Sequence, residues 1–167
     1  MINKVERQKY FDQKNETAYK FYSQNRFEKK VRAIVRRGDK FYVLYNKFKN
    51  IYGIAGGGVE DNETIEQACV REIQEELGIN AKVTNFIEKV YYNSKQTYKN
   101  KTFISKRVEF YFLCDYVSDF PHTKLGIAGE FSDSVEVKLI SKDQFLQTDF
   151  GRFSKRIIKA LKKALNE

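Results

Sequence analysis

The sequence is poor in the residues that interrupt, cross-link or anchor a chain. Its 167 residues include one proline, two cysteines and one histidine. With a single proline there is no proline-rich linker, and the length is typical of one domain. No apolar stretch approaches the roughly 20 residues that cross a bilayer, and the first residues are polar and charged rather than a signal-peptide core. We therefore expect a cytoplasmic protein with no membrane segment.

The few cysteines and the single histidine argue against a thiol or histidine metal site. Cys69 and Cys114 stand alone, without the paired spacing of metal ligands. We expect them to be reduced, buried thiols rather than a disulfide. His122 follows Pro121 in an expected loop, and we expect it to lie at the surface rather than to act in catalysis.

The residues that are abundant are apolar and basic. A hydrophobic fraction of 41% and an aromatic fraction of 15% are typical of a folded globular chain. The formal net charge is +9, and a basic surface attracts anions such as nucleotides or nucleic acids. A solvated surface rich in lysine explains the charge equally well, so charge alone does not define a function.

The apolar pattern predicts a mixed sheet packed between helices. Residues 1–28 are polar and aromatic, and are compatible with a strand, a short helix or a dimer arm. After them, the pattern predicts a hairpin at 31–36 and 41–45, a glycine-rich connection at 50–58, a helix at 63–77, strands at 83–92 and 107–117 around a polar tip at 93–100, a strand at 134–140, a short helix at 141–145 and an amphipathic helix at 154–165. Asp61 or Asn62 is expected to cap the first helix, and Gly78 to end it.

Three glutamates fall close together on the expected helix of residues 63–77. Glu72, Glu75 and Glu76 lie within about one turn, because positions three and four apart share a helix face. Carboxylate oxygens are the ligands that Mg²⁺ prefers, and the glycines before the helix allow backbone to approach such a site closely. Arg71 lies four residues before Glu75 and can pair with one carboxylate. Three acids alone are also typical of a solvated helix face, so the spacing of their neighbours matters.

These neighbours follow a specific spacing. The pattern consists of Gly57, Glu63, Arg71, Glu72, Ile73, Glu75, Glu76, Gly78 and Ile79. It resembles the complete signature box of the Nudix hydrolase family. The resemblance implies an α/β (α+β) fold, the family's α/β/α sandwich with a mixed β-sheet, over residues 29–167, with residues 1–28 as an N-terminal extension. Ala55 stands where the family often has a proline.

The resemblance also implies roles for single residues. Glu72, Glu75 and Glu76 match the family's metal ligands, joined by the backbone carbonyl of Gly56. Arg71 matches the arginine that orients a catalytic glutamate, while Glu63, Gly57 and Gly78 match structural positions. The general base is left open between Glu72 and a carboxylate on a later loop, for which Glu130 is the first candidate and Asp133 and Glu136 are alternatives.

The function implied by the resemblance is metal-dependent hydrolysis of a phosphoric anhydride. The substrate would be a nucleoside diphosphate-linked compound (a nucleotide, nucleotide sugar or dinucleotide), the cofactor Mg²⁺ or Mn²⁺, and the assembly a possible homodimer. Two alternatives stay open, a pyrophosphohydrolase of RNA 5′ ends and a non-catalytic nucleotide-binding module.

The flanking residues leave the substrate open. Tyr91, Tyr92 and Tyr98 are placed either to stack on a base or to pack in strands. The lysines at positions 95, 99 and 101 are placed either to contact phosphates or to solvate a hairpin tip.

Overall fold

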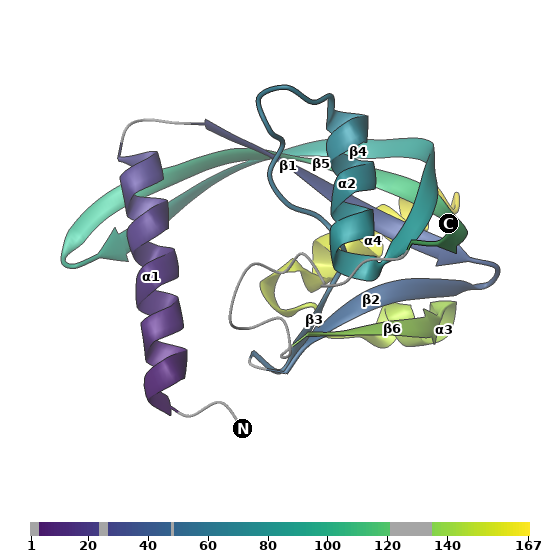
Figure 1. Ribbon diagram of the computed structural model, residues 1–167, viewed down its shortest axis with the longest axis horizontal. Helices are drawn as coiled ribbons and strands as arrows, with labels where there is room; N and C mark the ends of the chain where they lie inside the picture. The colour runs from purple at the N-terminus through teal and green to yellow at the C-terminus, as the bar shows by residue number, and fades with distance from the viewer. Residues whose placement is uncertain (1–3, 24–26, 48, 121–134) are drawn as a thin grey trace.

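A six-stranded mixed sheet organises the molecule (Figure 1). The computed structural model describes residues 4–23, 27–47, 49–120 and 135–167. Its elements are α1 (Lys4–Tyr22), β1 (Phe27–Arg37), β2 (Lys40–Asn46), β3 (Ile51–Gly53), α2 (Ile65–Leu77), β4 (Ile79–Tyr98), β5 (Lys101–Asp119), β6 (Val135–Ser141), α3 (Lys142–Gln147), the 3₁₀ turn η2 (Gly151–Phe153) and α4 (Ser154–Ala164). The strands run in the order β3-β2-β1-β5-β4, with β6 paired to β2. The expected α+β fold with a mixed sheet is confirmed.

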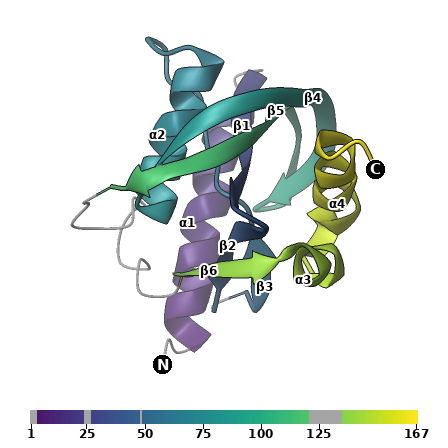
Figure 2. The same ribbon diagram turned by 90° about the vertical axis from the view of Figure 1, so that its right-hand side faces the viewer.

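Helices cover both faces of this sheet. Figure 2 shows α2 on one side, and α3 and α4 on the other. Alternation along β1 explains the two layers, because successive side chains of a strand point to opposite faces. Val31, Ala33 and Val35 join the buried cluster that contains the apolar residues of α2. Ile34, between them, joins the buried cluster that contains those of α4.

Helix α2 begins two residues later than the sequence suggested. Its N-cap is Thr64, whose side chain accepts a hydrogen bond from the backbone N–H of Gln67. The prediction of Asp61 or Asn62 as the cap was therefore wrong. Thr64 is the cap because Gln67 lies three residues after it and bonds back to it. The side-chain oxygen of Gln67 accepts a hydrogen bond from the backbone N–H of Thr64, which completes a capping box. Gly78 ends the helix in the left-handed region, at φ 67°, as expected.

Strands β1 and β2 form the expected hairpin but separate soon after their turn. They pair only at Arg36↔Phe41 and Arg37↔Lys40. Beyond that point the glycine-rich connection runs beside β1, where Val31 N donates to Gly57 O at 3.0 Å and Ala33 N donates to Ala55 O at 2.8 Å. The separation of the two strands thus makes room for the loop that leads into α2.

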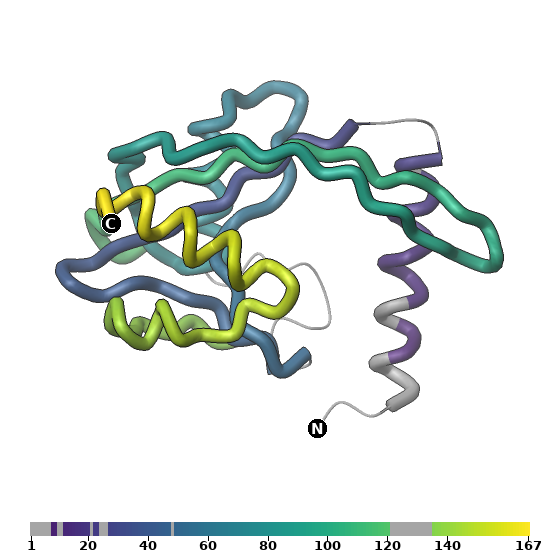
Figure 3. Tube along the Cα trace, turned by 180° about the vertical axis from the view of Figure 1, so that it is seen from behind, coloured from purple at the N-terminus to yellow at the C-terminus, as the bar shows by residue number. Residues whose placement is uncertain are grey.

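The β4–β5 hairpin is longer than the sequence pattern predicted. Residues 93–100 were expected to form a polar tip, yet β4 and β5 stay paired until Tyr98↔Lys101. The turn itself is only Lys99 and Asn100, both at positive φ, as in a type I′ hairpin turn. The outer part of the hairpin forms an arm that extends from the sheet, and α1 packs against it (Figure 3). The rings of Tyr19 and Phe103 meet there, with centroids 5.6 Å apart.

The two cysteines lie in the core of the protein. Cys69 and Cys114 are free and buried, as expected, with their Sγ atoms 3.8 Å apart. No helix in the described part of the chain is both long and apolar enough to span a membrane.

Candidate active site

The glycine-rich loop lies directly against the carboxylates of α2. A Cβ on Gly57 would lie 2.2 Å from Oε1 of Glu72, so any side chain at that position would displace this carboxylate. Gly56 has φ 149°, and a Cβ there would lie 2.1 Å from the carbonyl oxygen of Val31. Its backbone N–H donates to Oε2 of Glu76 at 2.8 Å. By contrast, a Cβ on Gly58 would contact no described atom within 4 Å.

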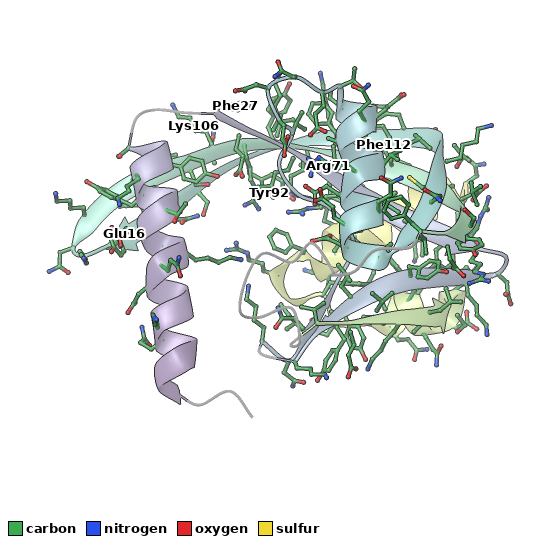
Figure 4. The ribbon with its side chains drawn as sticks, viewed as in Figure 1. Glu16, Phe27, Arg71, Tyr92, Lys106 and Phe112 are labelled. Atoms are coloured by element: carbon green, nitrogen blue, oxygen red, sulfur yellow. The ribbon has the colours of Figure 1, made fainter. Side chains whose placement is uncertain are left out.

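Arg71 connects the loop and three glutamates (Figure 4). Its guanidinium donates to both carboxylate oxygens of Glu63, at 2.6 and 3.1 Å. It also donates to Oε1 of Glu72 at 2.9 Å, to Oε2 of Glu75 at 3.2 Å and to the carbonyl oxygen of Gly58 at 2.9 Å. The sequence predicted only one partner. The hydrogen bond from Arg71 lowers the pKa of Glu63, which is consistent with a structural role for that side chain.

Among the carboxylates of α2, Glu72 and Glu76 are those whose pKa is raised by burial. Burial raises the pKa of Glu72, although the hydrogen bond and charge of Arg71 act in the opposite direction. Burial also raises the pKa of Glu76 to about 7, with the negative charges of Glu72 and Glu75 adding to the effect of burial. Two desolvated carboxylates thus lie side by side with less positive charge than would balance them.

This donor set fits a hard divalent cation. Mg²⁺ and Mn²⁺ bind carboxylate and carbonyl oxygens, and a cation would supply the positive charge that Glu76 lacks. Among the residues that the structure describes, no three His, Cys, Asp or Glu side chains are already gathered around one point as a metal cage, because Arg71 lies between Glu72 and Glu75.

A buried charge network joins the glycine loop to the sheet. Arg32 donates from Nη1 to the carbonyl oxygen of Gly56 at 3.1 Å, and from Nη2 to Oε1 of Glu109 at 3.0 Å. Glu109 is fully buried and also accepts from the hydroxyl of Tyr111 at 3.0 Å. Burial would raise the pKa of Glu109, but the charges of Arg32 and Arg107 outweigh burial and lower it. The sequence pattern did not predict this network, although a glutamate at a core-facing position of β5 was a signal for it.

A family model described as the NUDIX domain matches residues 26–161. The chain belongs to the NUDIX family. The match covers the glycine loop, α2 and all six strands, and it leaves out α1.

Individual relatives of this NUDIX domain agree with the family assignment. It is 38% identical over 60 residues to a protein of Methanocaldococcus jannaschii named ADP-ribose pyrophosphatase, covering 34% of this chain and 36% of that protein. It is 36% identical over 95 residues to the nucleoside triphosphatase NudI of Escherichia coli, covering 54% of this chain and 64% of that protein. These matches therefore span less than two thirds of either relative.

A NUDIX hydrolase from Nitrosomonas europaea has a similar structure, with a TM-score of 0.61 over 83% of this chain and 90% of that chain. The sequence identity to it is 19%, so this likeness shows a shared fold.

Of the later-loop candidates for a general base, the described part of this NUDIX domain contains Glu136. Glu130 and Asp133 lie outside the described residues. Glu136 lies on β6, where it pairs with Lys47 at 2.7 Å and with Lys138 at 3.6 Å. These lysines lower the pKa of Glu136, which makes its carboxylate a weaker base than an unpaired one.

Proposed function

We propose that the protein is a metal-dependent pyrophosphohydrolase that cleaves a phosphoric anhydride in a nucleoside diphosphate-linked compound. The observation that carries the proposal is the contact between the glycine loop and α2. It places the desolvated carboxylates of Glu72 and Glu76 beside the backbone of Gly56 and Gly57. The carboxylates of a solvated helix face would be surrounded by water, whereas here the loop lies so close that a Cβ on Gly57 would overlap the Glu72 carboxylate.

Within this proposal, the metal is held by Glu72, Glu75, Glu76 and the carbonyl oxygen of Gly56. When bound, Mg²⁺ or Mn²⁺ neutralises phosphate charge and favours an activated water. Arg71 is a positioning residue, because one hydrogen bond holds Glu72 and one holds Glu75. Its other three, to Glu63 and to the carbonyl oxygen of Gly58, fix the guanidinium itself. Its donors are all directed at this chain, which leaves the carboxylates rather than the guanidinium to face a ligand.

The general base in this proposal is Glu72 or Glu130. A base works best when its pKa approaches the working pH. Burial raises the pKa of Glu72, which favours it over Glu136. The base accepts a proton from the attacking water as the new bond to phosphorus forms, and the bridging oxygen leaves with the other phosphate.

The substrate class rests on the relatives. Their names, ADP-ribose pyrophosphatase and nucleoside triphosphatase, indicate nucleotides as the compounds to test first. ADP-ribose would yield AMP and ribose 5-phosphate, whereas a nucleoside triphosphate would yield a nucleoside monophosphate and pyrophosphate.

A substrate panel tests the proposal. Nucleoside triphosphates, ADP-ribose, nucleotide sugars and dinucleotides are incubated with Mg²⁺ or Mn²⁺, and the products are separated by chromatography. We expect release of a nucleoside monophosphate that stops when EDTA is added. Glu72→Gln and Glu76→Gln should each reduce the rate at least about 100-fold, whereas Glu66→Gln, on the exposed side of the same helix, should not. Full activity in both site variants contradicts the site assignment.

A second candidate function is the same chemistry at an RNA 5′ end. The net charge of +9 favours it, since phosphate contacts with basic side chains dominate binding to nucleic acids. If RNA is the substrate, triphosphorylated RNA should be cleaved with a much higher kcat/KM than a mononucleotide, and the difference should shrink as salt rises. If no compound in the panel is cleaved but nucleotides bind, the protein is a non-catalytic nucleotide-binding module.

A further inference from the structure

An open cavity of about 510 Å³ lies where the arm joins the sheet, between the β4–β5 hairpin and the start of α4. This volume is within the range of small-molecule sites. Its lining carries five cationic side chains, those of Arg107, Arg152, Lys155, Arg156 and Lys159. No aspartate or glutamate of the described chain lines it, so the cavity concentrates positive charge.

Most of this charge is not balanced from within the described part of the protein. Among the described residues, no carboxylate forms an ion pair with the four cationic residues of η2 and α4, which are Arg152, Lys155, Arg156 and Lys159. Arg107 does have a partner, because its Nε lies 3.1 Å from Oε1 of the buried Glu109. The basic residues at the rim therefore have free donors for an anion.

One side chain that lines the cavity carries a buried polar atom without a hydrogen bond. The hydroxyl of Tyr92 makes none with the described residues (Figure 4 labels Tyr92), whereas the Nε of Arg107 lies 3.1 Å from Oε1 of Glu109. Buried polar atoms are normally satisfied by protein, water or ligand. Because this hydroxyl is buried, an anion in the cavity would first contact the exposed cationic side chains of Arg152, Lys155 and Lys159.

The aromatic rings in the cavity are already in contact with cations. The guanidinium of Arg156 lies 4.2 Å from the ring centroid of Tyr92, and that of Arg107 lies 4.7 Å from it. Arg152 lies 4.9 Å from the ring centroid of Phe153. A nucleobase would have to displace these guanidiniums in order to stack, whereas a phosphate would bind to them directly.

A short series of contacts connects the cavity lining to the candidate active site. Arg107 contacts Glu109, Glu109 accepts from Arg32, Arg32 donates to the carbonyl oxygen of Gly56, and Gly56 donates to Glu76. The cavity lining and the carboxylates of α2 are thus linked through residues of β1, β5 and the glycine loop.

We propose that this cavity binds a phosphate monoester of the substrate, separate from the anhydride that is hydrolysed. The protein would therefore select small nucleotides that carry an additional phosphate group. This inference rests on the proposed function, since the phosphate would belong to the same substrate, but its binding chemistry requires neither the metal nor hydrolysis.

Binding of a matched pair of ligands tests the proposal. ADP-ribose and ADP-ribose 2′-phosphate differ by one phosphate monoester, and calorimetry in EDTA measures both without turnover. We expect the 2′-phosphate compound to bind at least about 10-fold more tightly, because the added phosphate would accept charge-assisted hydrogen bonds from the cationic side chains of the cavity. Equal affinity of the wild-type protein for the two ligands, or binding of neither, overturns the proposal.

Variants locate the effect. Arg152→Gln with Arg156→Gln should reduce the preference to less than about 2-fold, and Lys155→Gln with Lys159→Gln, at exposed positions, should reduce it in part. Lys40→Gln with Lys82→Gln removes the same charge from distant exposed positions and should preserve the preference. If the control pair lowers the preference as much as the cavity pairs do, general surface charge binds the phosphate and the cavity does not.

Two other outcomes are informative. A triphosphorylated RNA oligonucleotide that displaces the 2′-phosphate ligand far more effectively than ATP, at the same salt concentration, overturns selection of small nucleotides in favour of RNA. A wild-type preference that is lost in the cavity variants, together with a substrate panel in which nothing is cleaved, supports the phosphate site and contradicts the hydrolase proposal alone.

Discussion

Replacing Glu76 by glutamine should stabilise the metal-free protein at neutral pH, although it removes a carboxylate from the candidate active site. The fold holds this carboxylate away from water, and burial together with the charges of Glu72 and Glu75 raises its pKa to about 7. The ionised form is therefore unfavourable in the folded state. A glutamine has nearly the same shape, carries no charge and keeps an oxygen that can accept from the N–H of Gly56.

The magnitude follows from the two pKa values of Glu76. Below about pH 4.5 the carboxyl is protonated in both the folded and the unfolded chain, and it contributes nothing to the pH dependence. Between about 4.5 and 7 the unfolded chain releases the proton first, so the free energy of unfolding falls by about 1.4 kcal/mol per pH unit. Above pH 7 the full cost of about 3 kcal/mol is present, and Glu76→Gln should recover most of it.

Urea unfolding in EDTA at pH 5 and pH 8 measures this effect. We expect Glu76→Gln to unfold with a free energy about 2–3 kcal/mol above that of the wild-type protein at pH 8, and with little difference at pH 5. The control Glu66→Gln, at the exposed start of α2, should lose less than about 1 kcal/mol, because it removes a favourable helix-dipole interaction. Mg²⁺ should raise the Tm of the wild-type protein and leave that of Glu76→Gln nearly unchanged. A variant that is less stable than the wild-type protein at pH 8 refutes the reasoning.

Three further predictions concern the loop and the helix. Gly57→Ala should lower the hydrolysis rate about 100-fold, because the new methyl group would displace the carboxylate of Glu72, while the free energy of unfolding falls by less than about 1 kcal/mol. Gly58→Ala is the control and should retain its activity in the same assay. Arg71→Lys should lower the free energy of unfolding in urea by about 2 kcal/mol, because lysine cannot make the five hydrogen bonds of the guanidinium. An unchanged free energy of unfolding would show that these hydrogen bonds do not stabilise the fold. Thr64→Ala should cost about 1 kcal/mol in thermal unfolding, while Asp61→Ala should be neutral if Thr64 alone is the cap.

The sequence was most informative where short-range spacing determines structure. Helical periodicity placed Glu72, Glu75 and Glu76 on one side of α2, and the left-handed preference of Gly78 placed its end. The importance of Gly57 also followed from the pattern, although its physical reason, the carboxylate of Glu72 lying against its Cα, needed the structure. The functional roles of these residues stay predictions.

The sequence was least informative where distant segments meet. Arg32 and Glu109 are 77 positions apart, and their pairing depends on the parallel register of β1 and β5. The outer halves of β4 and β5 cover little of the hydrophobic core, so their side chains are largely polar. Their sequence pattern therefore resembled that of a loop. Most of the described residues of α1 are exposed, so the helix has no continuous apolar face in its sequence. Its contacts with Phe103 therefore could not be predicted from the sequence.

The arm has a consequence for how the molecule opens. A two-stranded hairpin is only marginally stable by itself in water, and beyond the sheet the arm is supported mainly by α1, through the rings of Tyr19 and Tyr22 against Phe103. We expect α1 and the outer arm to exchange their amide hydrogens together and faster than the core strands, as one subglobal unfolding unit. Since Tyr92 and Arg107 lie at the inner end of this unit, opening of the arm would also dismantle one wall of the cavity.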